Sequence, residues 1–333
     1  MASGEWRSQR TISQSPISKS VQSVKSVDSS SPPVTIIIVA WNQLYKTLAC
    51  LEAVAAGDYG NARVLLVDNG STPPLAEAIH AHFPSIEVLR LPRNLGFAGG
   101  YNAGLREALS GPADLFLLLN NDTLPAPDAL SQLVACLAAA PDVGLATAKI
   151  YYAAEPSRIW TVGANLNVFL DLKDGGQGEI DAGQWAAPRD VDFAPFCAVL
   201  IRREVLEEVG LLDEEFFLYY EDMDYCRRMR RAGRRLRLCP DAHVWHDVSA
   251  SSGGRDSPTE RYWMAQSSGR YFRKHGRGPR MLLIIPFRLF SALKMTVRLL
   301  AAGKREALRA YWAGLLIGWR TGKSVTPKRR DTR

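Results

Sequence analysis

The run Val34-Thr-Ile-Ile-Ile-Val-Ala40 decides the class of fold that this chain can adopt. Six of its seven residues are β-branched and none is charged, which is typical of a strand buried on both faces of a sheet. Similar apolar runs follow at residues 63–68, 86–91, 114–119 and 143–150, and helical patterns lie between them at 44–56, 75–82, from about 99, and at 127–140. This alternation predicts an α/β fold with a Rossmann-like, mostly parallel sheet and helices on both faces.

Composition supports a globular protein with an unevenly charged surface. Of 333 residues, 47% are hydrophobic and 23% are charged, which excludes a disordered chain, a collagen-like fibre and a polytopic membrane protein. From residue 269 onward lie 17 of the 41 Lys and Arg residues but only two of the 34 acidic ones. We therefore expect an acidic body that binds no nucleic acid and a basic tail that needs a partner.

Cysteine usage and the N-terminal segment favour a cytoplasmic protein. The five cysteines are scattered and form no C-x-x-C pair, which argues against a disulfide framework and against a zinc site. Cys50 and Cys136 lie in apolar helical patterns, so we expect both to be small core residues in a reducing compartment. Residues 1–33 contain 11 serines and no signal-peptide core, and are predicted to be a disordered tail.

Polar loops follow three of the predicted strands. Trp41-Asn42 follows the first, Asp68-Asn-Gly-Ser-Thr72 the second and Asn120-Asn-Asp122 the fourth. Turn chemistry alone would explain any one of these loops, because Asn, Asp, Gly and Ser end strands in many proteins. In a parallel sheet, however, ligands bind at the carboxyl ends of strands, so the three loops together indicate a binding site.

These loops also carry a family resemblance. With Asn94-Leu-Gly-Phe-Ala-Gly-Gly100, Tyr220-Glu-Asp-Met-Asp224 and His246, they occur in the order of family 2 glycosyltransferases. The chain most resembles the rhamnosyltransferase-like branch, which also includes galactofuranosyl enzymes, and the resemblance spans roughly residues 34–275. It implies a GT-A fold, a nucleotide-sugar donor, a divalent metal and inversion at the anomeric carbon.

Each motif has a chemical reason to bind the donor. The carboxylate of Asp68 suits a pyrimidine N–H or ribose hydroxyls, although an Asx turn would need the same residue. The glycine-rich segment lets the backbone approach a ligand and starts a helix whose amide end favours anions. The residues to which the resemblance assigns donor binding are Asn42, Asp68, Asn94, Gly96, Phe97, Gly99, Gly100, Asn102 and Asn121.

The resemblance also implies a metal site and a general base. Asp122 occupies the position of the family's D-x-D metal motif, and His246 matches a histidine that can complete the shell around Mg²⁺ or Mn²⁺. Asp222 is assigned as the base and Glu221 as its support, although both carboxylates could equally cap the helix that follows. Neighbouring acids would raise the pKa of Asp222 and the arginines after it would lower this pKa, so the sequence does not decide the direction of the shift.

The C-terminal part contains an insertion and a basic amphipathic tail. Residues 160–187 are rich in Gly and polar residues and are predicted to form a lid or an acceptor-side insertion. Residues 281–300 carry three cations, too many for a bilayer-spanning helix. At helical spacing one apolar stripe comprises Ile285, Leu289, Leu293, Val297 and Leu300, and a second comprises Leu308, Tyr311, Trp312, Leu315 and Trp319. Such helices suit an anionic membrane surface, and packing on the catalytic domain is the alternative.

The sequence therefore predicts a disordered tail (1–33), a GT-A catalytic domain (34–275) and a basic amphipathic helical tail (276–333). The activity that the resemblance implies is transfer of L-rhamnose from dTDP-L-rhamnose to a lipid-linked or cell-envelope glycan, and we expect it at the cytoplasmic membrane face. The alternatives are UDP-galactofuranose or a UDP-hexose as donor, a sugar-nucleotide nucleotidyltransferase, and a non-catalytic scaffold that binds nucleotide-sugar. The nucleotidyltransferase is disfavoured because residues 40–44 lack the glycine-rich loop that those enzymes place after their first strand.

Overall fold

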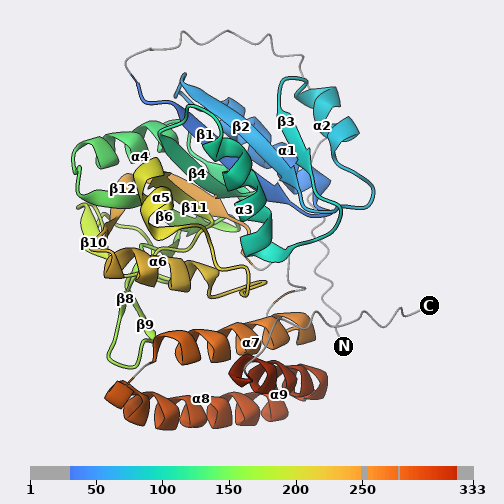
Figure 1. Cartoon of the computed structure of the whole chain (residues 1–333), viewed down its shortest axis with the longest axis vertical. Coiled ribbons are helices and arrows are strands. Elements are labelled where there is room, and N and C mark those ends of the chain that lie inside the picture. Colours follow the sequence, from blue (N-terminus) through green and yellow to red (C-terminus); the bar gives the residue numbers. More distant parts are fainter. Residues whose placement is uncertain (1–30, 249–253, 255, 277, 321–333) are drawn as a thin grey trace, which may run out of the picture.

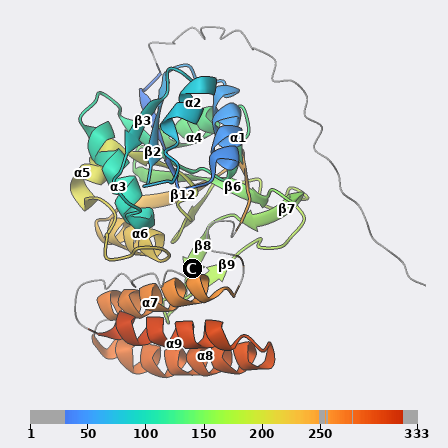
Figure 2. The ribbon, with the colours of Figure 1, turned by 90° about the vertical axis from the view of Figure 1, so that its right-hand side faces the viewer.

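The computed structural model describes residues 31–248, 254, 256–276 and 278–320. An α/β body lies on a layer formed by the C-terminal helices α7, α8 and α9 (Figure 1), and the side view in Figure 2 shows the same two parts. Of the tail predicted to be disordered, only residues 31–33 belong to the described residues, and residues 321–333 of the basic tail lie outside them.

The body is built on one large sheet with the strand order β10-β12-β6-β11-β4-β1-β2-β3. The bounds are β1 (Val34–Ala40), β2 (Ala62–Asp68), β3 (Glu87–Arg90), β4 (Leu115–Asn120), β6 (Val143–Tyr152), β10 (Arg189–Val191), β11 (Ala198–Arg202) and β12 (Arg235–His246). Strands β1 to β4 are parallel, and β11 runs antiparallel between β4 and β6. The predicted mostly parallel sheet is therefore confirmed, but its fifth predicted strand, β6, does not neighbour the fourth, because β11 lies between them.

Helices cover both faces of this sheet, as predicted. On one face lie α1 (Leu44–Ala55), α2 (Ala76–His82) and α4 (Ala129–Ala138), and on the other lie α3 (Gly96–Leu109), α5 (Arg203–Val209) and α6 (Glu221–Arg231). Each face carries its own hydrophobic core. Within β1, Ile36 and Ile38 belong to the core beneath α1 and Ile37 to the core beneath α3, because successive strand residues point to opposite faces. Both faces are thus apolar, which explains the uninterrupted β-branched run.

The strand register brings the predicted loops to one edge. Ala40 pairs with Asp68 and Val39 pairs with Asn120, so β1, β2 and β4 end at the same level. The short strand β5 (Thr123–Pro125) then pairs antiparallel with the end of β12, where His246 lies opposite Thr123. The loops after three strands and the end of a fourth therefore meet at this carboxyl edge.

Two local predictions differ from the structure. Helix α3 begins at Gly96, three residues before the expected start. The prediction that Cys136 is a free core residue is wrong: α4 packs against β12, and a disulfide joins Cys136 to Cys239. The two cysteines are 103 residues apart, so their spacing could not show this contact.

The insertion reaches the helical layer. Strand β7 (Glu155–Thr161) pairs with β6, and β8 (Ala164–Leu166) and β9 (Leu172–Asp174) form a hairpin that projects from the body towards the C-terminal helices (Figure 1). Phe169, in the turn of this hairpin, stacks on Phe287 of α8 with ring centroids 4.7 Å apart. The β8–β9 hairpin therefore lies between the body and the helical layer.

The helical layer is held together by close packing of α9 on α7. It consists of α7 (Pro258–His275), the 3₁₀ turn η1 (Gly278–Arg280), α8 (Met281–Ala301) and α9 (Arg305–Trp319). A Cβ atom on Gly314 or Gly318 would lie 2.2 Å from the carbonyl oxygen of Tyr262 or Gln266 in α7, so only glycine lets α9 approach this closely. Among the described helices, none combines the length and apolar character needed to cross a bilayer.

Candidate functional site

The first two loops of the carboxyl edge are held together by Asn42. Its backbone N–H donates to Oγ of Ser71 (3.0 Å), and its side-chain oxygen accepts from the N–H of Thr72 (2.7 Å). Asn42 has φ 57°, a left-handed conformation that Asn tolerates better than most residues. Its contacts thus shape the edge, and its role in donor binding stays a prediction.

Asp68 is completely buried at the end of β2. Its carboxylate accepts hydrogen bonds from the backbone N–H groups of Ser71 (2.9 Å) and Leu75 (3.0 Å) and forms an ion pair with Arg90. Burial acts to raise the pKa of Asp68, but these hydrogen bonds outweigh it and the pKa lies below its ordinary value. Asp68 is therefore ionised and holds the loop, and a contact with the donor remains a prediction.

The glycine-rich segment 94–100 packs against the protein itself. Gly96 has φ 77°, and a Cβ there would lie 2.3 Å from the carbonyl oxygen of Phe217, which accepts from the N–H of Phe97 (2.7 Å). A Cβ on Gly99 would lie 2.7 Å from Cβ of Leu95, and one on Gly100 would lie 2.8 Å from Cγ1 of Val39. Close packing within the protein thus explains why glycine occupies these positions, and a ligand is not needed to explain it.

Asn69 organises this segment, and the sequence analysis did not select it. Its side-chain amide donates to Oδ1 of Asn94 (3.1 Å) and to the carbonyl oxygen of Gly96 (3.0 Å), and its side-chain oxygen accepts from the N–H of Leu95 (2.9 Å). Asn69 lies in the quoted Asp68–Thr72 motif, so the motif was found but the residue was not. It fixes the start of α3 against the loop after β2.

Asn102 and Asn121 are also engaged by the protein. Asn102 exchanges hydrogen bonds with the backbone of Leu212 (2.8 and 3.0 Å) and donates to Glu214 (2.9 Å). The side-chain amide of Asn121 donates to Oγ1 of Thr47 in α1 (3.0 Å). Both asparagines are buried, so the contacts in the structure make them positioning residues, and the donor contacts predicted for them remain untested.

Asp122 and His246 come together where β5 meets the end of β12. Nε2 of His246 lies 3.2 Å from Oδ1 of Asp122, with the two side chains 9% and 6% exposed. The N–H of Asp247 donates to the carbonyl oxygen of Asp122 (3.0 Å), and Trp160 lies edge-on to the imidazole at 4.8 Å. Residues 124 positions apart in the chain are thus held in contact by backbone pairing.

This pair has the properties of a partial metal shell. Apart from the 3.2 Å contact between the two side chains, Oδ1 of Asp122 and Nδ1 of His246 are buried and have no hydrogen-bond partner among the described residues, an arrangement that is unfavourable unless something else binds there. A carboxylate oxygen and an imidazole nitrogen fit a divalent cation. No group of three or more His, Cys, Asp or Glu side chains suited to a metal occurs among the described residues, so other ligands would have to complete the shell.

Glu221 and Asp222 form the first turn of α6. Tyr219 and Tyr220 before them both have φ 67°, a left-handed conformation that costs free energy in non-glycine residues and often marks functional sites. Glu221 is buried and its Oε2 has no hydrogen-bond partner in the described part of the chain, whereas Asp222 is half-buried. The first turn of α6 therefore leaves the carboxylate of Asp222 partly accessible and encloses that of Glu221.

Burial decides the pKa of both carboxyl groups. It raises the pKa of Asp222 to about 6, although backbone hydrogen bonds from Met223, Asp222 and Phe196 act to lower it. Burial, followed by repulsion from Asp222, raises the pKa of Glu221 well above its ordinary value. The balance that the sequence left open is thus set by desolvation, with neither Asp224 nor the arginines after it among the main causes.

The base candidate and the metal pair lie around the same buried residues. The N–H of Asn120 donates to the carbonyl oxygen of Cys197 (2.9 Å), which places the start of β11 beside the loop that carries Asp122. Burial raises the pKa of the Cys197 thiol, and the negative charges of both Asp122 and Asp222 raise it further. One edge of the sheet thus holds both groups.

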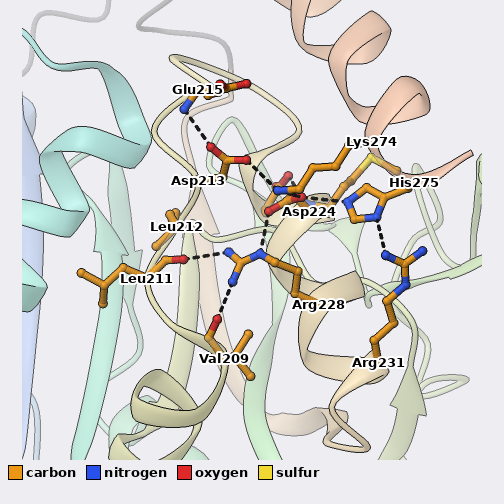
Figure 3. A network of polar contacts seen from close by, with 12 residues as sticks. Val209, Leu211, Leu212, Asp213, Glu215, Asp224, Arg228, Arg231, Lys274 and His275 are labelled. Carbon is orange, nitrogen blue, oxygen red and sulfur yellow. Dashed lines mark hydrogen bonds and ion pairs between the residues drawn. The ribbon is translucent and has the colours of Figure 1, made fainter. Parts of the chain in front are cut away.

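Asp224 serves a different purpose from Asp222. It is completely buried, and its carboxylate lies 2.8 Å from Nε of Arg228, 2.6 Å from Nζ of Lys274 and 2.7 Å from Nε2 of His275 (Figure 3). Burial acts to raise the pKa of Asp224, but its cationic and hydrogen-bonding partners outweigh it and the pKa is strongly lowered. Asp224 therefore anchors α6 to the end of α7.

Comparison with solved structures gives the class of protein: the fold is the GT-A fold. GalNAc-T7 with UDP, GalNAc and Mn²⁺ matches with a TM-score of 0.57 and 15% identity, covering 74% of this chain and 48% of that one. The mannosyltransferase PcManGT from Pyrobaculum calidifontis, in complex with GDP-Man and Mn²⁺, matches with a TM-score of 0.53 and 19% identity, covering 88% of this chain and 77% of that one.

Sequence comparison gives the family. Residues 32–265 match the model of glycosyltransferase-like family 2, and the chain belongs to this family. Relatives are the dTDP-rhamnosyl transferase RfbF of Shigella flexneri (24% identity, 72% of this chain and 79% of the relative), the N-acetylglucosaminyl-diphospho-decaprenol L-rhamnosyltransferase of Mycobacterium tuberculosis (26%, 58% and 68%) and the galactofuranosyltransferase GlfT1 of Mycolicibacterium smegmatis (25%, 83% and 94%). The predicted family and its rhamnosyltransferase-like relatives are thus confirmed.

Some relatives are much longer than this chain. An uncharacterized protein of Sinorhizobium fredii, y4gI, is 31% identical over 246 residues, which are 69% of this chain but 26% of that protein. The pre-mycofactocin glycosyltransferase of Mycobacterium tuberculosis is 32% identical over 191 residues, 37% of its length. The chain thus spans about a quarter to a third of these two relatives, and its activity, donor and acceptor have to be proposed.

Proposed function

We propose that this protein is an inverting, metal-assisted glycosyltransferase that moves L-rhamnose from dTDP-L-rhamnose to a hydroxyl group of a lipid-linked or cell-envelope glycan. The observation that carries the proposal is that a carboxylate with a pKa of about 6, Asp222, and the unpartnered Asp122–His246 pair lie around the same buried segment. Two relatives that are named as rhamnosyltransferases support the choice of donor.

In this mechanism Asp222 takes the proton from the acceptor hydroxyl as its oxygen attacks the anomeric carbon. A carboxylate with a pKa near 6 is ionised at neutral pH and is a stronger base than an ordinary Asp. Burial, followed by repulsion from Asp222, raises the pKa of Glu221 well above its ordinary value, which favours the neutral form of Glu221 beside the base. Attack and departure occur in one displacement, so the configuration at the anomeric carbon inverts and no sugar–enzyme bond forms.

Asp122 and His246 would hold Mg²⁺ or Mn²⁺ beside the donor diphosphate, whose oxygens and waters would complete the shell. A bound cation of this kind neutralises charge on the departing nucleotide diphosphate. The loop contacts of Asn42, Asp68 and Asn69 fix the shape of the sheet edge at which the nucleotide would bind. The Mn²⁺ in the two solved structures named above supports a divalent metal.

A galactofuranose donor is the second candidate. The galactofuranosyltransferase GlfT1 matches over 83% of this chain and 94% of its own length, a larger share of both chains than either rhamnosyltransferase. Identity is similar for all three relatives, so the donor has to be decided by experiment.

The proposed site of action is the cytoplasmic face of the membrane. All five residues of the first predicted apolar stripe in α8 are exposed, from 44% for Ile285 to 66% for Leu289. The second stripe is largely used inside the protein: Tyr311 is buried in the contact with α7 and α8, and only Trp312 exceeds one third exposure. Large exposed apolar patches mark interaction surfaces, and an anionic membrane is the partner we propose for α8.

A panel of nucleotide-sugars tests the function. Thermal shifts are measured with dTDP-L-rhamnose, UDP-galactofuranose, UDP-glucose and GDP-mannose, with and without Mn²⁺ or Mg²⁺. A donor at 100 times its dissociation constant should stabilise the protein by about 2.7 kcal/mol. Transfer from the stabilising donor to a lipid-linked glycan is then assayed. Absence of stabilisation by every donor with metal present would contradict the proposal, and binding without any turnover would support the scaffold alternative.

A further inference from the structure

Arg288 is a rigidly held cation without a carboxylate partner. It lies in the second turn of α8, where Cζ is 4.4 Å from the ring centroid of Phe272 and Nη2 donates to Oγ of Ser268 (2.9 Å). Among the described residues no Asp or Glu pairs with Arg288, and the bond from Nη2 to Ser268 is the one hydrogen bond that its guanidinium makes there. A fixed guanidinium with donors to spare is a binding group for an anion.

The position of Arg288 connects it with the candidate base. Phe272, whose ring carries the guanidinium, also packs edge-on against Tyr220 at 6.5 Å, and Tyr220 directly precedes Glu221 and Asp222. Burial raises the pKa of Tyr220, Arg288 acts to lower it, and Asp222 acts to raise it further, so both charges are close to the same ring. The adjacent Phe287 stacks on the insertion hairpin. Arg288 thus lies between the hairpin, α7 and the turn that presents Asp222.

The same helix has an open apolar face on its other side. Leu289, Leu293 and Val297 are 66%, 61% and 58% exposed, whereas Ile284, Ala292 and Leu299, on the face of Arg288, are buried. A helix that lies in a membrane interface buries its apolar face among the acyl chains and leaves its polar face at the level of the lipid phosphates. With α8 lying in this way, Arg288 would be at the depth of a phosphate attached to a lipid chain.

We propose that Arg288 binds the phosphate group of a lipid-linked acceptor, whose hydrocarbon chain lies along the exposed face of α8 and whose sugar reaches Asp222. This inference rests on the proposed function. One relative is named for an acceptor of this chemistry, a diphospho-decaprenol carrying a sugar. The guanidinium donates hydrogen bonds to phosphate oxygens and orients the acceptor, while Asp222 does the chemistry.

Vesicle binding tests the proposal without knowledge of the sugar. The full chain is titrated with phosphatidylcholine vesicles that contain a few mole per cent of either decaprenyl diphosphate or decaprenol. The parent should bind the diphosphate vesicles about 10–100-fold more tightly, which is the usual worth of hydrogen bonds to a charged group. Arg288→Met keeps much of the packing on Phe272 and should lose most of this preference, and Arg288→Lys should keep part of it.

Lys294→Ala is the matched control, because Lys294 is an exposed cation of the same helix and has no ion pair in the described part of the chain. Lys294→Ala should retain the tighter binding to the diphosphate vesicles. A preference unchanged in Arg288→Met, or lost equally in Lys294→Ala, would overturn the proposal. Equal weakening of Arg288→Met on both vesicles would assign Arg288 to general membrane binding or to packing, which also overturns it.

An activity measurement separates this proposal from the proposed function. Transfer is compared between N-acetylglucosaminyl-diphospho-decaprenol and a neutral octyl N-acetylglucosaminide. Arg288→Met should raise KM about tenfold or more for the diphosphate acceptor only, and leave KM for the donor unchanged. A rise in the donor KM would place Arg288 at the donor diphosphate and contradict the proposal. If the parent transfers to neither acceptor, the proposed function fails, and the vesicle measurement still decides the role of Arg288.

Discussion

Asp224 and His275 face each other in a buried contact that ties the helix of the candidate base to the last turn of α7. Nε2 of His275 lies 2.7 Å from Oδ1 of Asp224, and Nδ1 of the same ring accepts from Arg231 at 3.2 Å (Figure 3). With Nδ1 as acceptor, Nε2–H donates to Asp224 and the ring is neutral. Burial lowers the pKa of His275 although Asp224 acts to raise it, which agrees with this arrangement.

The first prediction concerns this anchor. Asp224→Asn leaves Arg228 without its buried counter-charge and Lys274 with Asp213 as its remaining partner, and breaking such a buried contact costs about 3–5 kcal/mol of the free energy of unfolding. Urea denaturation should show this loss. Glu87→Gln is the control, because its ion pair with Arg63 is largely exposed and should change stability by less than about 1 kcal/mol. Equal stability of both variants would mean that Asp224 anchors nothing.

The second prediction concerns the metal. Asp122→Asn should abolish the enhancement of nucleotide binding by Mn²⁺ or Mg²⁺ and leave the fold intact, because the amide removes the negative charge but keeps the shape. Isothermal titration with dTDP, with and without metal, measures the effect. Asp247→Asn is the matched control: Asp247 adjoins His246 but is exposed and pairs with Lys46. Metal-dependent affinity that survives in Asp122→Asn would remove Asp122 from the metal site.

The sequence predicted the elements of the site better than the contacts of its side chains. The β-branched strands and the loops that follow them gave the carboxyl edge, because strand ends in a parallel sheet must coincide. Spacing cannot show where a side chain points, however. Asn102 and Gly100 match the family's motif, yet the first holds Leu212 and the second makes room for Val39.

The sequence also could not predict contacts between distant segments, because residue spacing does not show which segments pack together. Asp224 belongs to a recognised motif, but its partners Lys274 and His275 lie about 50 residues further on, in a helix whose packing no local pattern encodes. The Cys136–Cys239 disulfide and the insertion of β11 between β4 and β6 likewise depend on tertiary structure. The division of the chain at residue 275 stays a prediction.

The third prediction concerns the membrane. Replacing both Leu289 and Leu293 by Glu puts two charges on the exposed face of α8 and should release the protein from anionic vesicles, measured by sedimentation. Added salt should weaken binding of the parent. Deletion of residues 281–333 is a poorer test, because α9 packs closely on α7. Tyr45→Glu, an exposed change in α1, is the control. Undiminished binding of the α8 variant would show that this face is not used.

The fourth prediction concerns pH. A base acts only when it is deprotonated, and the pKa of Asp222 is raised to about 6 by burial. The value of kcat/KM should therefore rise about tenfold per pH unit below pH 6 and level off above it. Steady-state rates between about pH 4.5 and 8 give the curve, with donor binding measured over the same range to exclude a binding effect. If kcat/KM instead rose and levelled off near pH 4, the range of an ordinary Asp, this would contradict the burial of the Asp222 carboxylate or its role as base.

The last prediction separates chemistry from binding. Asp222→Asn keeps the size of the side chain but cannot take a proton, so transfer should fall by about 10²–10⁴-fold while donor and metal bind almost as in the parent. Glu221→Gln should cost far less, because in this mechanism Glu221 only supports Asp222 and the amide keeps the size of its side chain, while burial raises the pKa of Glu221 and so already favours its neutral form. Single-turnover rates and donor titrations measure both effects. If Asp222→Asn lost donor affinity in proportion to its rate, Asp222 would be a donor ligand or a helix cap. A larger loss in Glu221→Gln would instead move the role of base to Glu221, with Asp222 as its support.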